Sequence, residues 1–340
     1  MKFLLKMSGV RACALAAGIV FGVAANTTLA ADPVTTVRVA DFLPAQHVFY
    51  TCSMEKWIAE VDRTAKERIR VNYLGGGKVV GATEILDGVR RGVADMGVLV
   101  VDYWPDRLNL ASFSSLPYVF PDPKKGTEIL HELMKGEMGE NFRKEGIEPV
   151  MILLTTPRQI ALARDRVKSL NDLKGLKLRA LGWEARTLEA LGATTISVAI
   201  AEVATSQRTG IIDGSTQTYY AMPGWGLMDA TKQAVELRGY THTLVVLGAS
   251  TQKWKAWPQA VRDTMSAVSR SIESSWVDCQ SQRDEEIVSQ FKKQGVPVYR
   301  ISDGELERAR QMVKPVFDKW LAAVGPSGAK VLDQYNALMK

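Results

Sequence analysis

The chain has 340 residues, of which 46% are hydrophobic, and its 43 Lys and Arg against 37 Asp and Glu give a formal net charge of +6. This size and apolar content suit one large or two medium domains, and the sequence contains no internal repeat or low-complexity tract. The basic residues are scattered among acids and form no stripe interleaved with aromatic residues, so we expect no nucleic-acid partner.

The first 30 residues have the pattern of a secretory signal peptide. Lys2, Lys6 and Arg11 form a basic region, residues 12–25 are mostly apolar, and Thr28-Leu29-Ala30 offers small residues for cleavage. About 14 apolar residues are too few for the ~20 that cross a bilayer, and no later segment is long and apolar enough. We therefore expect a periplasmic mature protein without stable membrane insertion.

Strands and helices alternate through the first half of the chain. The periodicity predicts strands at 35–41, 69–74, 94–101, 147–154 and 159–163, with helices at 50–66, 82–91 and 126–135 between them. The stretch from Lys168 to Gln217 adds two short strands, the first ending at Arg179 and the second at 194–199, each followed by a helix. Such alternation predicts parallel αβ units, whose strand ends usually line a ligand crevice.

The C-terminal part is dominated by one long helical pattern. We predict a helix ending at Ala234, a strand at 242–247 and then a helix from Pro258 to about 294, stopped by Gly295. A short strand at 297–301 precedes a capping box at Ser302–Glu305. Because no clean linker interrupts the chain, we expect two lobes that share crossing strands.

Two cysteines, Cys52 and Cys279, remain after removal of the signal peptide. A disulfide is possible in an oxidising compartment, but buried free thiols fit the sequence equally well. The sequence leaves this choice open.

Motifs for cofactor or metal chemistry are weak. The run Gly75-Gly76-Gly77-Lys78 is followed by Val79, where a phosphate loop needs Ser or Thr. None of the three histidines has metal-ligand spacing with another His or Cys, and no Gly-x-Ser-x-Gly elbow occurs. We therefore expect no cofactor, no metal and no catalytic site.

A set of residues without nucleophile or base stands out instead. Arg158, Arg179 and Gln217 are polar residues at or near predicted strand ends, and a guanidinium offers a planar fork that matches a carboxylate. Aromatic residues lie in nearby loops or strand ends, namely Tyr103, Trp104, Trp183, Tyr220 and Trp225. Such a set suits an anion with apolar flanks, although Arg179 alone is also consistent with an ordinary ion pair.

Several short motifs follow one another between Val37 and Gly248. They are Gly81–Glu84 through Arg91–Gly97, Leu116–Phe120, Leu170–Arg179, Leu191–Ala193, Glu202-Val203 and Gly210–Gly214. In order and spacing these motifs resemble the solute-binding proteins of tripartite ATP-independent periplasmic (TRAP) transporters, in the branch known for binding C4-dicarboxylates, sialic acids and related organic acids.

The resemblance implies a binding site as well as a fold. Arg179 would be the main carboxylate-binding residue, Arg158 a supporting arginine and Gln217 a polar contact. Ala204 stands where the family often has Tyr, and Phe42 and Val100 replace polar groups of sialic-acid binders, with Tyr103, Trp183 and Tyr220 nearby. These departures favour a smaller or more apolar organic acid, since a hydroxyl buried without a partner costs roughly 1–3 kcal/mol.

The implied fold is α/β and two-lobed, with strands crossing between lobes and a long helix in the C-terminal half spanning both. We expect residues 31–155 with about 243–282 in lobe I, and 156–242 with about 283–340 in lobe II. The implied function is capture of an organic acid in the interlobe cleft, followed by hinge closure and delivery to TRAP membrane permease subunits.

Two alternatives from other classes stay open. A periplasmic enzyme acting on an organic acid would need a general base, for which only His47 and Glu84 are placeable near the crevice. A ligand-sensing module that presents its closed form to a membrane receptor is not separable from transport by sequence.

Overall fold

One sheet combines strands from distant parts of the sequence. In the computed structural model, which describes residues 33–340, its strands lie in the order β2 (Ile69–Leu74), β1 (Thr35–Ala40), β3 (Met96–Val100), β10 (Leu244–Ser250) and β4 (Ile147–Leu154). β1 is parallel to β2 and β3, whereas β10 runs antiparallel between β3 and β4. Every residue of β10 is buried, as expected for a strand with both neighbours and both faces covered.

The second sheet contains the unit predicted between Lys168 and Gln217. Its order is β11 (Val298–Arg300), β9 (Gln233–Glu236), β5 (Gln159–Leu162), β8 (Gly214–Gln217), β6 (Lys177–Arg179) and β7 (Thr194–Ile196). β6 is parallel to β7 and β8, with α5 (Gly182–Ala190) and α6 (Val203–Thr209) as connections. The predicted parallel αβ unit is therefore confirmed.

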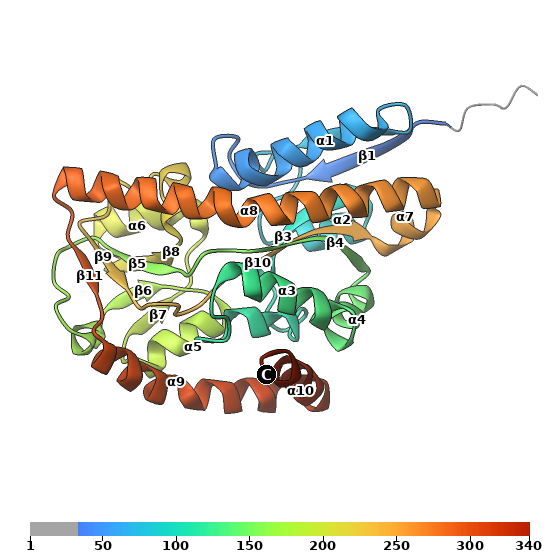
Figure 1. Ribbon diagram of the computed structural model, residues 1–340. Coiled ribbons are helices and arrows are strands. Elements are labelled where there is room, and N and C mark those ends of the chain that lie inside the picture. Colours follow the sequence, from blue (N-terminus) through green and yellow to red (C-terminus); the bar gives the residue numbers. More distant parts are fainter. Residues whose placement is uncertain (1–32) are drawn as a thin grey trace, which may run out of the picture. The chain divides into compact units, whose positions relative to one another are not determined.

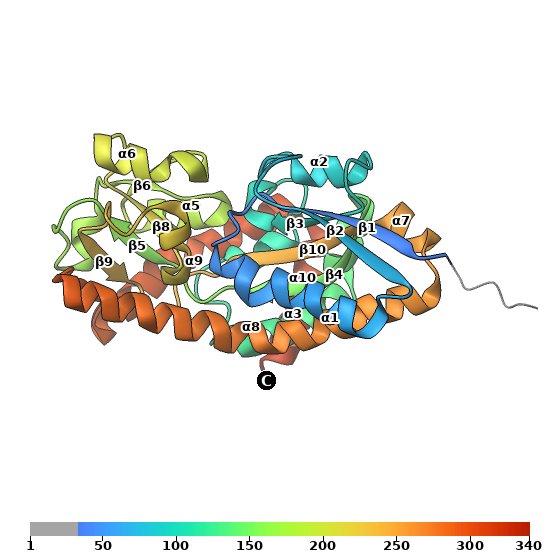
Figure 2. The same ribbon diagram turned by 90° about the horizontal axis from the view of Figure 1, so that it is seen from above.

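Two connections and one long helix join the sheets. Residues 155–158 lead from β4 to β5, and residues 237–243 return from β9 to β10. α8 (Gln259–Gln294) runs along both sheets (Figures 1 and 2). Ile272 and Trp276 of α8 pack in the core beside the first sheet, and Ile287 and Phe291 pack in the core beside the second. The expected long helix is confirmed, and Gly295 ends it in the left-handed conformation with φ 69°.

The remaining helices pack around the sheets or against one another. They are α1 (Glu55–Ala65), which follows one π-helical turn at Tyr50–Met54, α2 (Ile85–Arg90), α3 (Pro123–Met134), α4 (Glu137–Lys144), α7 (Thr251–Ala256), α9 (Asp303–Val324) and α10 (Pro326–Leu338). α9 begins with the predicted capping box, in which Ser302 and Glu305 satisfy each other's backbone N–H groups.

A disulfide joins Cys52, in the turn before α1, to Cys279 on α8, with 6.0 Å between their Cα atoms. The structure thus decides the alternative that the sequence left open. The bond fixes the two helices that lie side by side over the first sheet (Figure 2).

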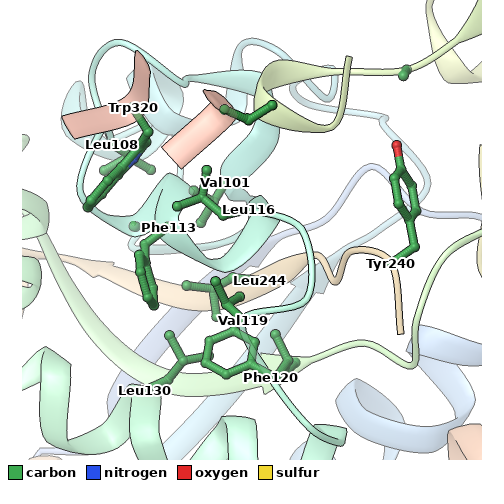
Figure 3. Close-up of a cluster of buried hydrophobic side chains, with 14 of the residues drawn as sticks. Val101, Leu108, Phe113, Leu116, Val119, Phe120, Leu130, Tyr240, Leu244 and Trp320 are labelled. Carbon is green, nitrogen blue, oxygen red and sulfur yellow. The ribbon is translucent and has the colours of Figure 1, made fainter. Parts of the chain in front are cut away.

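The chain after β11 returns to the helices of the first sheet. Trp320 of α9 packs against Phe113 with ring centroids 5.4 Å apart, inside the apolar cluster of Figure 3. The Trp320 indole N–H also donates to Ser112 Oγ at 3.2 Å, and α10 packs on α3 and α4. The lobe boundaries expected from the sequence stay a prediction.

One predicted helix is absent, and one predicted segment is not described by the structure. The helix predicted to end at Ala234 is wrong, because residues 233–236 form the buried strand β9. The predicted signal peptide, residues 1–30, lies outside the described residues. Among residues 33–340, no helix is both long and apolar enough to cross a membrane.

Candidate ligand-binding site

Three polar residues meet at one edge of the second sheet. Arg179 ends β6 and Gln217 ends β8, and these strands are parallel, so both residues lie at their carboxyl ends. Arg158 directly precedes β5, whose first residue pairs with Gln217 because β5 runs antiparallel to β8. The topology therefore brings together the three residues that the sequence singled out.

These residues line a cavity with an empty volume of about 610 Å³, including its open mouth. The first sheet contributes Phe42 after β1, Val100 at the end of β3, and Tyr103 beyond it, and Tyr220 comes from the turn after β8. Seven of the eight site residues predicted from the sequence thus line one cavity.

Trp183 does not line this cavity. It lies in a separate hollow with Pro105 and Asp106, because α5 starts at Gly182, where φ is 51°, and the chain turns between Leu181 and Trp183. Leu181 lines both spaces. In the hollow, Arg186 Nη1 lies 3.1 Å from Glu189 Oε2, so the charge of Arg186 is already paired within the protein.

Arg179 is the unsatisfied cation of the cavity. Its side chain is 2% exposed, its Nε donates to Val198 O at 3.1 Å, and its Nη2 has no hydrogen-bond partner among the described residues. Burial lowers the pKa of Arg179, and the neighbouring Tyr103 opposes that shift. A buried cation without a counter-ion is costly, so an anionic ligand would be strongly favoured here.

Arg158 has the opposite environment. Its Nε lies 2.8 Å from Glu184 Oε1 in an ion pair, although the Nε–H bond does not point at that oxygen. Its Nη1 donates to Thr243 Oγ1 at 2.9 Å, and its Nη2 donates to Thr216 O at 2.6 Å. Burial lowers the pKa of Arg158, but Glu184 and Asp102 outweigh it and raise the pKa above the usual value. Arg158 can add positive potential, while its charge is paired with Glu184 and its Nη1 and Nη2 atoms already donate within the protein.

Asp102 adds a titratable acid to the cavity wall. Its carboxylate accepts hydrogen bonds from Ser115 and, at 3.1 Å, from Thr243 Oγ1. Burial raises the pKa of Asp102 to about 6 in spite of these bonds. Thr243 therefore links Asp102 to Arg158, donating to the former and accepting from the latter.

Gln217 offers the second free donor. Its side-chain Nε2 is buried and has no partner within the described part of the chain. Together with Arg179 Nη2 it places unpaired N–H groups on adjacent strand ends, which suits the two oxygens of one carboxylate.

The sequence did not indicate Glu184 or Asp102 at this site, and it indicated His47 only as a candidate base for an enzyme. Glu184 neutralises Arg158, Asp102 carries the raised pKa, and His47 presents an unpartnered ring nitrogen. The position of His47 in the sequence indicates that it lies near the cavity, because it follows the first strand in the same loop as Phe42. Glu84, the other base considered for an enzyme, does not line the cavity. Within residues 33–340, no group of three His, Cys, Asp or Glu could hold a metal ion.

The protein has two mixed sheets joined by crossing strands, and the cavity at their strand ends holds an unpaired cation. This fold and this site are those of an α/β solute-binding protein. The chain belongs to the bacterial extracellular solute-binding protein family 7, whose family model matches residues 39–323. The resemblance seen in the sequence is thereby confirmed.

Curated and solved relatives agree with this family. A solute-binding protein of Chromohalobacter salexigens is 21% identical over 79% of this chain and 80% of its own length. The TRAP solute-binding protein of Rhodoferax ferrireducens, solved with copurified benzoate, superposes with a TM-score of 0.82 at 18% identity, over 90% of this chain and 97% of that one.

A marine metagenome TRAP solute-binding protein specific for aromatic acid ligands, solved with 3-hydroxybenzoate, also gives a TM-score of 0.82, at 19% identity over 90% and 98% of the two chains. At these identities the solved structures establish the fold. They confirm the two-lobed α/β architecture expected from the sequence.

Proposed function

We propose that this protein is the extracytoplasmic solute-binding subunit of a TRAP transporter, and that it captures an organic acid through an ion pair with Arg179. The observation that carries the proposal is the buried, unpaired Nη2 of Arg179 beside the free Nε2 of Gln217, in a cavity with apolar walls. Structural neighbours that bind benzoate or 3-hydroxybenzoate, both carboxylates, support it.

The proposed cycle uses lobe closure. The carboxylate meets Arg179 and Gln217 on the second sheet, and Phe42, Val100 and Tyr103 of the first sheet cover the ligand's apolar part. Closure removes water, which strengthens the ion pair, and shifts an equilibrium between open and closed forms that separate membrane permease subunits recognise. The protein would work in the periplasm after removal of its signal peptide.

The proposal includes the absence of turnover. A general base in this cavity would have to be His47 or Asp102. Burial lowers the pKa of His47 to about 4, which makes it a weak proton acceptor at neutral pH, and the Asp102 carboxylate already accepts hydrogen bonds from Ser115 and Thr243. We therefore expect a bound acid to be recovered unchanged after prolonged incubation. Formation of a product that depends on His47 or Asp102 would favour an enzyme instead.

Substitution of Arg179 tests the binding role. Arg179→Ala should weaken binding of the cognate acid by ~2–5 kcal/mol, which is about 30-fold to several thousand-fold. The ligand-free variant should be at least as stable as the wild type, because an uncompensated buried cation is removed. The measurements are calorimetric titration with an acid found by a thermal-shift screen, and urea unfolding without ligand.

Arg186→Ala is the matched control, since Arg186 is an exposed arginine on α5 and pairs with Glu189 on the surface. It should bind as the wild type does. A change below about threefold for Arg179→Ala would remove Arg179 from the proposed role.

A further inference from the structure

His47 enters the cavity from the loop after β1, on the side of the first sheet. It is 5% exposed, and its ring lies 5.6 Å from the Trp225 ring and 6.4 Å from the Tyr220 ring, centroid to centroid. A Cβ atom at Gly224 would come within 2.7 Å of His47 Cδ2, so the backbone of this turn packs directly on the imidazole. The ring is therefore packed between a glycine and two aromatic side chains.

The hydrogen bonds of His47 determine where its proton lies. The backbone N–H of Phe49 donates to His47 Nδ1 at 3.1 Å, so Nδ1 carries no hydrogen and the neutral ring has its hydrogen on Nε2. Burial lowers the pKa of His47 to about 4, which keeps the ring neutral at physiological pH. The Nε2 atom is buried without a partner among residues 33–340, and an unmet buried donor is costly.

We propose that His47 is a specificity-determining residue, whose Nε2–H donates to a second, neutral oxygen acceptor on the bound organic acid. This inference rests on the proposed function, in which Arg179 and Gln217 on the other sheet hold the carboxylate. The ligand class is then a monocarboxylic acid with a carbonyl, ether or hydroxyl oxygen at the end remote from its carboxylate.

Charge argues against a dicarboxylate, although the sequence resemblance includes binders of C4-dicarboxylates. The charged residues that line the cavity are Arg179, Arg158 and Asp102, and Glu184 already neutralises Arg158. The groups packed on the His47 ring, Gly224, Tyr220 and Trp225, carry no charge. A second carboxylate beside His47 would be buried against a neutral donor and apolar rings, at a cost that one hydrogen bond does not offset.

Matched ligands separate these possibilities. The aliphatic set is pentanoate, 4-oxopentanoate and pentanedioate, and the aromatic set is 3-methylbenzoate, 3-formylbenzoate and benzene-1,3-dicarboxylate. Within each set the shape is similar, while the end remote from the first carboxylate is apolar, a neutral acceptor or a second anion. Dissociation constants are measured calorimetrically with the mature protein at pH 7.5.

Two polar variants isolate the Nε2–H group. His47→Asn keeps an acceptor near the Nδ1 position for the Phe49 N–H but has no donor at the Nε2 position, whereas His47→Gln can place an N–H there. In at least one set, the oxo acid should bind the wild type at least tenfold more tightly than its apolar partner. His47→Asn should reduce that ratio below about threefold, and His47→Gln should keep a larger part of it.

Gly224→Ala gives an independent readout, because the added Cβ displaces the ring without removing its donor. It should also reduce the ratio. The inference is overturned if the diacid binds the wild type most tightly, if the apolar acid binds as well as the oxo acid in both sets, or if His47→Asn weakens all three ligands equally. Acids that bind through Arg179 without discrimination by His47 would leave the proposed function intact, whereas failure of every acid to bind would contradict both.

Discussion

Glu184 is the buried acid that makes the two arginines of the site different. Glu184 lies on α5 and is 1% exposed. Its Oε2 accepts a hydrogen bond from Thr216 Oγ1 at 2.7 Å. Its Oε1 accepts one from Thr241 Oγ1 at 3.2 Å and lies 2.8 Å from Arg158 Nε. The carboxylate thus neutralises Arg158 and leaves Arg179 as the cation without a direct ion pair in the described cavity. The second buried acid, Asp102, is linked to Arg158 through Thr243, so neither acid forms a direct ion pair with Arg179.

Removing the charge of Glu184 should therefore destabilise the protein even without ligand. Glu184→Gln leaves the Arg158 cation buried beside Arg179, so we expect the free energy of unfolding to fall by roughly 3–5 kcal/mol. Urea unfolding monitored by circular dichroism measures the change.

Glu189→Gln on the same helix is the control, since Glu189 pairs with Arg186 at the surface and should cost less than about 1 kcal/mol. Equal midpoints for Glu184→Gln and the wild type would show that Arg158 does not depend on this acid.

At the residue scale, the sequence predicted which binding residues lie at strand ends, but it did not predict their ion-pair partners. Arg179 and Gln217 follow from the rule that parallel strands end at one edge, which needs only the local pattern. Glu184 was not found because nothing in the sequence pairs it with Arg158, 26 positions away, until the sheet forms. Trp183 was misplaced because residues on either side of a helix start face different spaces, and periodicity does not resolve a single turn.

At the element scale, α8 uses polar side chains to hold the segment that crosses between the sheets. Glu273 Oε1 accepts from the Ile152 N–H at 2.6 Å, Gln280 Oε1 accepts from the Thr156 N–H at 2.7 Å, and Trp276 Nε1 donates to Leu154 O at 2.9 Å. These α8 residues recur at helical spacing, so they lie on one face of the helix. They satisfy backbone groups on the last residues of β4 and just beyond, where the chain leaves the first sheet.

The disulfide strengthens the same helix. It closes a loop across a sequence separation of 227 residues, so loss of the cross-link should lower the free energy of unfolding by about 2–5 kcal/mol. Urea unfolding of the oxidised protein and of the Cys52→Ser/Cys279→Ser variant measures the difference.

Adding a reductant is the control for the disulfide. It should shift the midpoint of the wild type toward that of the variant and leave the variant unchanged. Two titratable thiols in the native, oxidised protein would contradict the pairing.

Elements with strong periodicity and clear end signals were predicted well, as α8 with Gly295 and α9 with its capping box show. The helix predicted to end at Ala234 failed because β9 obtains its stability from neighbours. It pairs with β5 and β11, and its polar Gln233 is buried, with Oε1 accepting from the N–H groups of Arg166 and Val167. Tertiary pairing of this kind overrides local propensity.

At the scale of the whole molecule, the sequence indicated crossing strands but not their places in the sheets. β10 inserts between β3 and β4, far from its sequence neighbour β9, which lies in the other sheet. Such long-range pairings depend on contacts that no local window contains. The same arrangement places Asp284 of α8 between the stretch of the helix that packs near the first sheet and the stretch that packs near the second.

Asp284 couples this junction to pH. Its Oδ1 accepts from the Tyr220 backbone N–H at 2.6 Å, in the turn that lines the ligand cavity. Burial raises the pKa of Asp284 to about 7, against the effect of that hydrogen bond. Between its ordinary value near 4 and this raised value, the folded protein binds a proton that the unfolded chain releases. Asp284 therefore lowers the free energy of unfolding progressively as pH rises from about 4 to about 7.

Asp284→Asn should remove this pH dependence while keeping an oxygen acceptor for Tyr220. The variant should match the wild type only below about pH 4, exceed it by roughly 1.4 kcal/mol at pH 5 and exceed it by up to about 4 kcal/mol at pH 8, since each pKa unit is worth 1.36 kcal/mol. Urea unfolding at pH 5, 6, 7 and 8 gives the difference between the two proteins, in which the contributions of His47, Asp102 and other unchanged groups cancel. A difference that stays constant across these pH values would mean that Asp284 titrates in its ordinary range and does not link the junction of the two sheets to pH.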